Sequence, residues 1–235
     1  MKAYTYLLID FFTLLIPFVF SFHPKLRFDK KWSYFFPAMI VVALVFLFWD
    51  AYFTHIGVWG FNPDYLIGFS ILNLPLEEIL FFVCIPYACV FTYHCFKKLG
   101  IQPFSPTLGK WISLGLIISL SLLLVFNYGK LYTTSTFILL LFTLFYLEWI
   151  SKINLTSFYF TYAILLIPFS ITNGILTGSF IPNEVVWYND QENLGFRLGT
   201  IPFEDIFYGL LLILWNVRLM EFLELRNQSN SSAAG

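Results

Sequence analysis

Two short acidic motifs place adjacent carboxyl groups at the start of long apolar runs. Residues 75–78 read Pro-Leu-Glu-Glu, and residues 202–205 read Pro-Phe-Glu-Asp. Carboxyl groups are rare in such surroundings and usually have a function there. A pair of them can serve as a general acid and a general base when the surroundings keep one protonated and the other ionised. We therefore predict acid–base chemistry, with these catalytic residues: Glu77, Glu78, Glu204 and Asp205.

The two motifs belong to a longer internal repeat. Residues 58–83 return 127 positions later without a gap, so that Phe61 aligns with Tyr188 and Asn62 with Asn189. A single motif could be an ordinary helix start, because proline suits the first turn and acids there interact favourably with the helix dipole. Two copies in a chain that otherwise avoids charge favour a functional interpretation.

The composition is typical of a polytopic membrane protein. Of the 235 residues, 59% are hydrophobic and only 11% are charged, which a soluble domain does not show. The net charge of −1, without a long basic run, argues against nucleic acid as a partner. We expect apolar molecules and membrane lipid as partners. A spanning helix needs about 20 apolar residues, and seven segments qualify: 4–21, 34–52, 75–96, 111–127, 131–150, 157–175 and 202–221.

These segments predict an all-α fold with two parallel three-helix repeats joined by a linker helix. Both motifs open helices that are four spans apart, so both enter the membrane from the same face. If the N-terminus is outside, ten Lys and Arg residues are cytoplasmic and three are not, which predicts a cell-membrane protein with a cytoplasmic C-terminus. The expected divisions are a first repeat at 1–98, a linker helix at 99–130, a second repeat at 131–225 and a disordered tail at 226–235.

Other polar groups are expected near the level of the motif acids. Arg197 is a candidate counter-ion that would hold one acid ionised while its neighbour stays protonated. The complete predicted polar network is Asp10, Asp50, Asn62, Asn173, Asn189 and Arg197.

Aromatic rings are expected beside the acids, because side chains four positions apart share a helix face. Such rings could stabilise a cation through their π-electrons. The candidates are Phe81, Phe82 and Tyr208 on the helices and Trp59 and Trp187 in the loops. The loops themselves, at about 53–74 and 176–201, are expected to fold over the bundle, since irregular backbone near the membrane must be covered by protein or water.

Cofactor and metal sites are not indicated. The sequence has no dinucleotide fingerprint after a strand, no phosphate-binding loop and no cluster with metal-ligand spacing. Cys84, Cys89 and Cys95 lie in one apolar run and are expected to be packing residues. We therefore predict a reaction without a cofactor or a metal ion.

The doubled motifs, each preceded by Asn and Gly at fixed spacing, and the helix ends Trp49-Asp50 and Asn173-Gly174, resemble the membrane-integral lycopene cyclase family. In that family the two halves are separate subunits in some bacteria and fused in others, and this chain resembles a fused form. The resemblance implies a lycopene beta-cyclase of carotenoid biosynthesis. Such an enzyme protonates an end of lycopene, closes a β-ionone ring and releases a ring proton, giving gamma-carotene or beta-carotene without oxidation.

Two alternatives remain open at the level of the residues. A related branch that resembles this family hydrates carotenoid ends, and it differs mainly in whether water reaches the cation. Proton-coupled transporters also combine parallel repeats with acids inside the membrane. The aromatic, uncharged surroundings of the motifs favour a large apolar substrate over an ion path.

Overall fold

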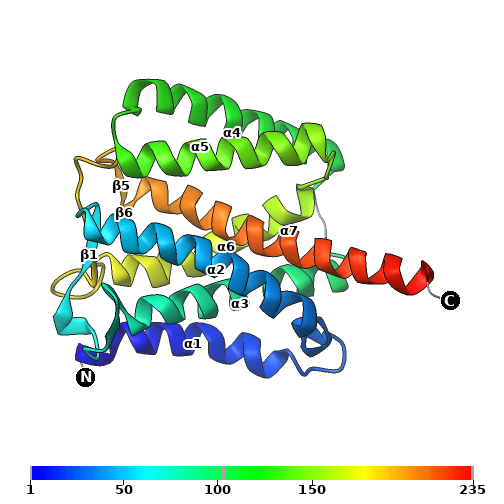
Figure 1. The fold of residues 1–235 in the computed structure, drawn as a ribbon, viewed down its shortest axis with the longest axis horizontal. Coiled ribbons are helices and arrows are strands. Elements are labelled where there is room, and N and C mark those ends of the chain that lie inside the picture. Colours follow the sequence, from blue (N-terminus) through cyan, green and yellow to red (C-terminus); the bar gives the residue numbers. More distant parts are fainter. Residues whose placement is uncertain (1, 102–103, 234–235) are drawn as a thin grey trace.

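The computed structural model describes residues 2–101 and 104–233. This part of the chain has seven helices that are long and apolar enough to cross a membrane (Figure 1). The helices are α1 Thr5–Phe20, α2 Trp32–His55, α3 Leu76–Lys98, α4 Pro106–Asn127, α5 Leu131–Phe145, α6 Thr156–Leu176 and α7 Phe203–Ala233, with α5 continued by a π-helical turn at Tyr146–Ile150. Short 3₁₀ turns lie at Lys2–Tyr4, Phe28–Lys31 and Pro63–Tyr65. All seven predicted helices are confirmed.

The two acidic motifs open α3 and α7 at the same end of the bundle. Pro75 has an extended backbone and immediately precedes α3, and Pro202 takes the same place before α7. Proline cannot donate a hydrogen bond into a preceding turn, so it suits a position at the helix boundary. The acids therefore lie in the first turn of each helix.

Each motif is preceded by a small hairpin, and the hairpins follow the repeat. In the first repeat, β2 (Ser70–Ile71) pairs with β3 (Leu74–Pro75). In the second, β5 (Arg197–Leu198) pairs with β6 (Ile201–Pro202), with the same register 127 positions later.

The two long loops are joined by one antiparallel strand pair. Strand β1 (Trp59–Phe61) pairs with β4 (Val186–Tyr188), with Gly60 opposite Trp187 at the centre. The backbone N–H of Asn62 donates to Val185 O at 2.8 Å, and that of Asn189 donates to Val58 O at 2.9 Å. Asn62 and Val58 of the first repeat correspond to Asn189 and Val185 of the second, so each hydrogen bond is the counterpart of the other. The strand pair therefore lies on an approximate two-fold axis.

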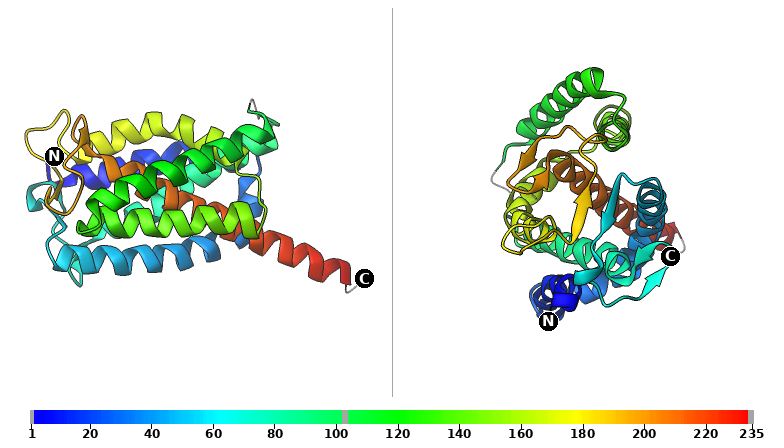
Figure 2. Two further views of the ribbon diagram at one scale, coloured as in Figure 1. Left: turned by 90° about the horizontal axis from the view of Figure 1, so that it is seen from above. Right: turned by 90° about the vertical axis from the view of Figure 1, so that its left-hand side faces the viewer.

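The helices of the two repeats pack in equivalent ways. Helix α1 packs on α3 and α5 packs on α7, while α3 and α7 contact each other at the centre. Helix α2 also packs on α7, and α6 packs on α3, so each repeat contributes a helix to the surroundings of the other. Helix α4 packs on α5 and α6 at the edge of the bundle (Figure 2).

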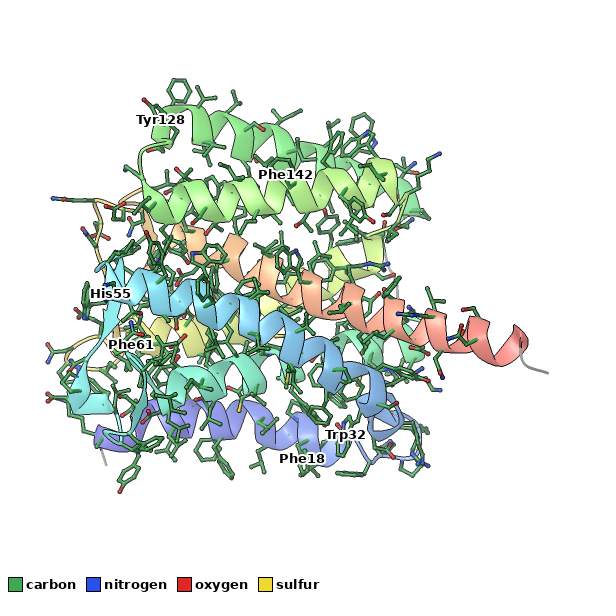
Figure 3. All side chains as sticks on the ribbon, viewed as in Figure 1. Phe18, Trp32, His55, Phe61, Tyr128 and Phe142 are labelled. Atoms are coloured by element: carbon green, nitrogen blue, oxygen red, sulfur yellow. The ribbon has the colours of Figure 1, made fainter. Side chains whose placement is uncertain are left out.

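The side chains identify the two ends of the bundle. His55 and Phe61 lie at the end that carries the loops, whereas Phe18 and Trp32 lie toward the opposite end (Figure 3). The N-terminus lies at the loop end, and the last turns of α7 project beyond the bundle at the other end (Figure 1).

A disordered tail is predicted at 226–235, and helix α7 extends into the described part of this segment. Helix α7 continues to Ala233, the last described residue, and the Asn227 amide donates to the Tyr34 hydroxyl at 2.9 Å. Extending an existing helix by one residue costs far less than starting one, so polar residues can continue the helix that the apolar span has begun.

The strand pair supplies a test of the fold. A Cβ atom at Gly60 would lie 2.4 Å from Trp187 Cζ2, whereas one at Gly115 in α4 would have no heavy atom within 4 Å. We expect Gly60→Ala to destabilise the protein by about 1–3 kcal/mol, as overpacking does, and Gly115→Ala to have no such effect. Thermal unfolding in detergent measures both. Adding Trp187→Ala to the Gly60→Ala variant should restore its stability, because the clashing ring is removed. Equal unfolding temperatures for the two glycine variants would show that the strand pair does not hold the loops together.

Candidate active site

All four motif carboxyl groups are buried at the loop end of the bundle. The exposed fraction is 0% for Glu77 and Glu204, 8% for Glu78 and 5% for Asp205. Buried carboxyl groups need hydrogen-bond donors or a proton, so their partners indicate what each one can do.

The first acid of each motif binds the loop that precedes it. Glu77 Oε1 accepts the Ile67 backbone N–H at 2.6 Å, and Glu204 Oε1 accepts the Leu194 backbone N–H at 2.7 Å. The two bonds are equivalent under the shift of 127 residues. Thr133 also donates to Glu204 Oε1, at 2.5 Å. Glu77 and Glu204 therefore fasten the loops to the starts of α3 and α7.

The second acid of each motif is bound by a buried tyrosine. The Tyr6 hydroxyl of α1 donates to Glu78 Oε2 at 2.5 Å, and the Tyr132 hydroxyl of α5 donates to Asp205 Oδ1 at 2.6 Å. Sequence reasoning missed both tyrosines, because they are 126 positions apart and not 127. A tyrosine near the start of the first helix of each repeat was the signal that could have identified them.

Asp205 has two further donors. The Asn173 amide of α6 donates to Oδ2 at 2.7 Å, and the Tyr188 hydroxyl of β4 donates to the same oxygen at 3.1 Å. Burial, together with the nearby Asp205 carboxylate, holds the pKa of Tyr188 well above its ordinary value, so this phenol stays a neutral donor. The predicted site residue Asn173 is thus placed beside a motif acid, and Tyr188 is added to the site.

Glu78 lies instead among other carboxyl groups. Asp10 of α1 and Asp50 of α2 are 1% and 2% exposed, and both are close enough to Glu78 for their charges to interact. The Trp59 indole N–H donates to Asp50 Oδ1. Both oxygens of Asp10 and Oδ2 of Asp50 are buried without a hydrogen-bond partner among the described residues. The two predicted aspartates therefore lie near the motif acid Glu78.

An aromatic cluster connects the two groups of acids. The Trp59 ring, which binds Asp50, lies 5.1 Å from the Tyr132 ring and 6.2 Å from the Tyr188 ring, both of which bind Asp205. The Tyr208 ring lies 6.3 Å from Trp59 and 6.1 Å from Tyr132. The predicted Phe81 ring lies 6.3 Å from Tyr6, and the predicted Phe82 ring lies 6.2 Å from Phe46.

The expectation that Arg197 pairs with a motif acid is corrected. Its guanidinium donates to Asp190 at 2.5 Å and to the Thr200 carbonyl at 2.9 Å. Arg197 therefore neutralises an acid of its own loop.

Three other predicted site residues have structural contacts in the loops. The side-chain oxygen of Asn62 accepts the Asp64 N–H, and that of Asn189 accepts the Gln191 N–H, each at 3.1 Å. Such a bond to the backbone two residues on is the ordinary turn conformation of asparagine. Trp187 covers Gly60 and is 39% exposed, so it lies outside the aromatic cluster.

The site combines groups that can move protons with rings that can face a cation. In the described part of the chain, no three His, Cys, Asp or Glu side chains form a set that could hold a metal ion.

Parts of the chain are similar to fungal proteins described as bifunctional lycopene cyclase/phytoene synthase. The protein from Aspergillus niger is 35% identical over 63 residues, which are 27% of this chain and 11% of the fungal protein. Those from Podospora anserina and Colletotrichum graminicola are each 32% identical, over 36% and 43% of this chain and 16% and 17% of the fungal proteins. The matched segments thus span less than a fifth of these relatives. No solved structure matches the chain.

The family comparison covers both repeats. A model of the family described as lycopene cyclase matches residues 3–96 and 129–223. The first segment runs from near the start of the chain to near the end of α3, and the second contains α5, α6 and most of α7. The part between them, 97–128, contains α4 and the loop before it. The match extends over well more than half of the sequence and includes every buried acid described above: the chain belongs to the lycopene cyclase family.

Proposed function

We propose that this protein is a lycopene beta-cyclase, an isomerase that closes β-ionone rings on lycopene in carotenoid biosynthesis without a cofactor. One observation carries the proposal: each repeat buries a carboxyl group at the same end of the bundle, and an aromatic cluster lies between the two. The family membership and the names of the fungal relatives support it.

The reaction needs one proton to be delivered and another to be removed. Protonation of the terminal double bond creates a tertiary cation, the neighbouring double bond attacks it, and loss of a ring proton forms the ring double bond. Glu78 and Asp205 are the proton-carrying groups in this proposal, because each is buried and held by tyrosine. The rings of Trp59 and Tyr208 stabilise the cation and keep water from it.

Glu77 and Glu204 have a positioning role in the proposal. Each accepts a backbone N–H ten residues earlier in the chain and so holds a loop over the site. The matching amide keeps a carbonyl oxygen that can accept the same bond, whereas alanine removes it.

A mostly apolar groove is evidence in favour of a long hydrocarbon substrate. It lies between α2, α5 and α7, with a volume of about 560 Å³. At its wall the Trp215 ring lies 5.6 Å from Phe46, which in turn lies 5.1 Å from Tyr208 of the site. A proton-coupled transporter would need a continuous series of polar groups along this route, whereas most of the residues that line the groove are apolar. The groove is lined by Val41, Val42, Val45, Phe142, Thr143, Tyr146, Leu147, Ser151, Ile153, Trp215, Arg218, Leu219 and Phe222.

The proposed orientation in the cell membrane follows from charge. The loops at the end opposite the acidic motifs connect α1 to α2, α3 to α4 and α5 to α6. These loops, the helix ends that adjoin them and the C-terminal half of α7 hold ten of the thirteen Lys and Arg residues, so this end faces the cytoplasm in the proposal.

Amide substitutions test the roles of the acids. We expect Glu78→Gln and Asp205→Asn to lower the cyclisation rate by about 10²- to 10⁴-fold, the usual contribution of general acid or base catalysis. Glu77→Gln and Glu204→Gln should lose much less, because the loop hydrogen bond can still form. The measurement is pigment analysis in a lycopene-producing host at equal protein levels in the membrane. Full ring formation by all four variants would refute the catalytic assignment, and hydroxylated pigment from the unchanged protein would identify a hydratase.

Narrowing the groove tests its role. Val45 lines the groove and is 47% exposed, whereas Val125 of α4 is 68% exposed and lies outside it. We expect Val45→Trp to raise the KM for lycopene about tenfold, which corresponds to roughly 1.4 kcal/mol of lost binding. Val125→Trp should leave KM unchanged. An equal KM for both variants in liposomes would exclude the groove as the binding site of the hydrocarbon chain.

Reporter fusions test the orientation. A reporter that is active only in the cytoplasm should give a signal when it is fused after Gly235. The same reporter inserted at Gly68, where the loop faces open space, should be silent. Signals of the opposite pattern would reverse the orientation, and equal signals at both positions would contradict the odd number of spans.

A further inference from the structure

The two repeats differ in the residues that surround the second motif acid. Four positions after the tyrosine that binds this acid, α1 has Asp10 and α5 has Thr136. Both side chains are buried, at 1% and 0% exposure, so they occupy corresponding places. The second repeat has a hydroxyl group where the first has a carboxyl group.

A second carboxyl group is replaced in the same way. Asp50 near the end of α2 corresponds to Asn173 near the end of α6, and each lies four residues before a threonine, Thr54 or Thr177. Asn173 donates to Asp205, whereas Asp50 interacts by charge with Glu78.

The first repeat therefore has more buried carboxyl groups than donors. None of the ion pairs in the described part of the chain includes Asp10, Asp50 or Glu78. Tyr6 and Trp59 each donate one hydrogen bond to this group, and Glu77 adds a further carboxyl group that interacts with Asp10. Neighbouring carboxylates without a cation cannot all be ionised in an apolar interior, so this cluster shares protons.

The second repeat presents the opposite case. Asp205 accepts hydrogen bonds from Tyr132, Asn173 and Tyr188. An ionised carboxylate only accepts hydrogen bonds, and several donors stabilise that form. The neighbouring Glu204 has its own donors, Leu194 N–H and Thr133.

We propose that the two repeats divide the two proton transfers: Glu78, supplied by its cluster with Asp10 and Asp50, donates the proton, and Asp205 removes the ring proton. This assignment rests on the proposed cyclase function. Tyr6 occupies Oε2 of Glu78, so the transferable proton is on Oε1. Asp10 and Asp50 are positioning residues that keep Glu78 protonated.

Each proton transfer is coupled to the making or breaking of a C–H bond. The Glu78 proton forms a C–H bond at the terminal double bond, and the resulting cation takes the electron pair of the neighbouring double bond to form the ring C–C bond. Asp205 then takes a proton from the ring carbon next to the new cation, and that C–H electron pair becomes the ring double bond. One proton enters and one leaves, no electrons are exchanged, and exchange with water resets both carboxyl groups.

Isotope labelling separates the two roles. The full-length protein in liposomes is given lycopene in D₂O, and the carotenoids are analysed by mass spectrometry and NMR. The unchanged protein should form rings that each carry deuterium from the first step. Glu78→Gln should lower total deuterium uptake by about 10²-fold or more and leave unlabelled lycopene. Asp205→Asn should still protonate lycopene and give labelled lycopene, or labelled products with a misplaced double bond, in place of the normal ring.

A second variant keeps the carboxyl group of Asp205. Asn173→Asp replaces a donor with an acidic group and should raise the ratio of labelled lycopene to ringed product. Thr172→Ser, at a partly exposed neighbouring position, is the matched control and should keep the normal ratio.

The outcomes are distinguishable. If the unchanged protein forms no ring, the proposed function fails. If it forms labelled rings, the division is supported only when Asp205→Asn takes up deuterium and Glu78→Gln does not, with Asn173→Asp shifting the ratio. Three results would overturn the division: the reverse pattern, equal labelling of both variants, or no labelling by either variant. The last result counts only when the unfolding temperatures of both variants match that of the unchanged protein. If Asp205→Asn does not fold, Asn173→Asp replaces it, and if Glu78→Gln does not fold, Asp10→Thr replaces it. A labelling pattern in the replacement variant that equals that of the unchanged protein also overturns the division.

Discussion

Carboxyl groups inside an apolar helix bundle must find hydrogen-bond donors or hold a proton, and this constraint accounts for much of the local structure. Glu77 and Glu204 obtain their donors from loop backbone, which fixes the loops over the starts of α3 and α7. Glu78 and Asp205 obtain theirs from tyrosines at the starts of α1 and α5. The same bonds that satisfy the acids thus assemble the helix ends, the loops and the candidate active site.

Each acid site is made within its own repeat, and the contact between repeats is made by aromatic side chains. Trp59 is central to this contact, because it binds Asp50 of the first repeat and touches Tyr132 and Tyr188 of the second. The β1–β4 pair holds Trp59 in place. Pairing across an approximate two-fold axis brings two similar sites together. The sites then differ chemically where corresponding positions hold different residues, as with Asp10 in α1 and Thr136 in α5.

The fold and the motif acids were predictable from the sequence, but their partners were only partly so. Hydropathy identified all seven spans, and the gapless repeat identified the acids that the structure buries together. Tyr6 and Tyr132 were missed because the helices carrying them are offset by one residue from the rest of the repeat. The predicted site residue Trp187 lies outside the aromatic cluster because it aligns with Gly60 and not with Trp59, and adjacent strand residues point to opposite faces. Arg197 and the loop asparagines bond to groups of their own loops, and residue spacing alone does not predict these local partners.

In the proposed division the two repeats hold protons unequally, and infrared spectroscopy of the protein in liposomes can detect this difference. A protonated carboxyl group has a carbonyl stretch that a carboxylate lacks. The difference spectrum between the unchanged protein and Glu78→Gln should show the loss of a protonated-carboxyl band, while the spectrum for Asp205→Asn should show the loss of carboxylate bands alone. Loss of the protonated-carboxyl band in Asp205→Asn, with no such loss in Glu78→Gln, would show that Asp205 and not Glu78 holds the proton.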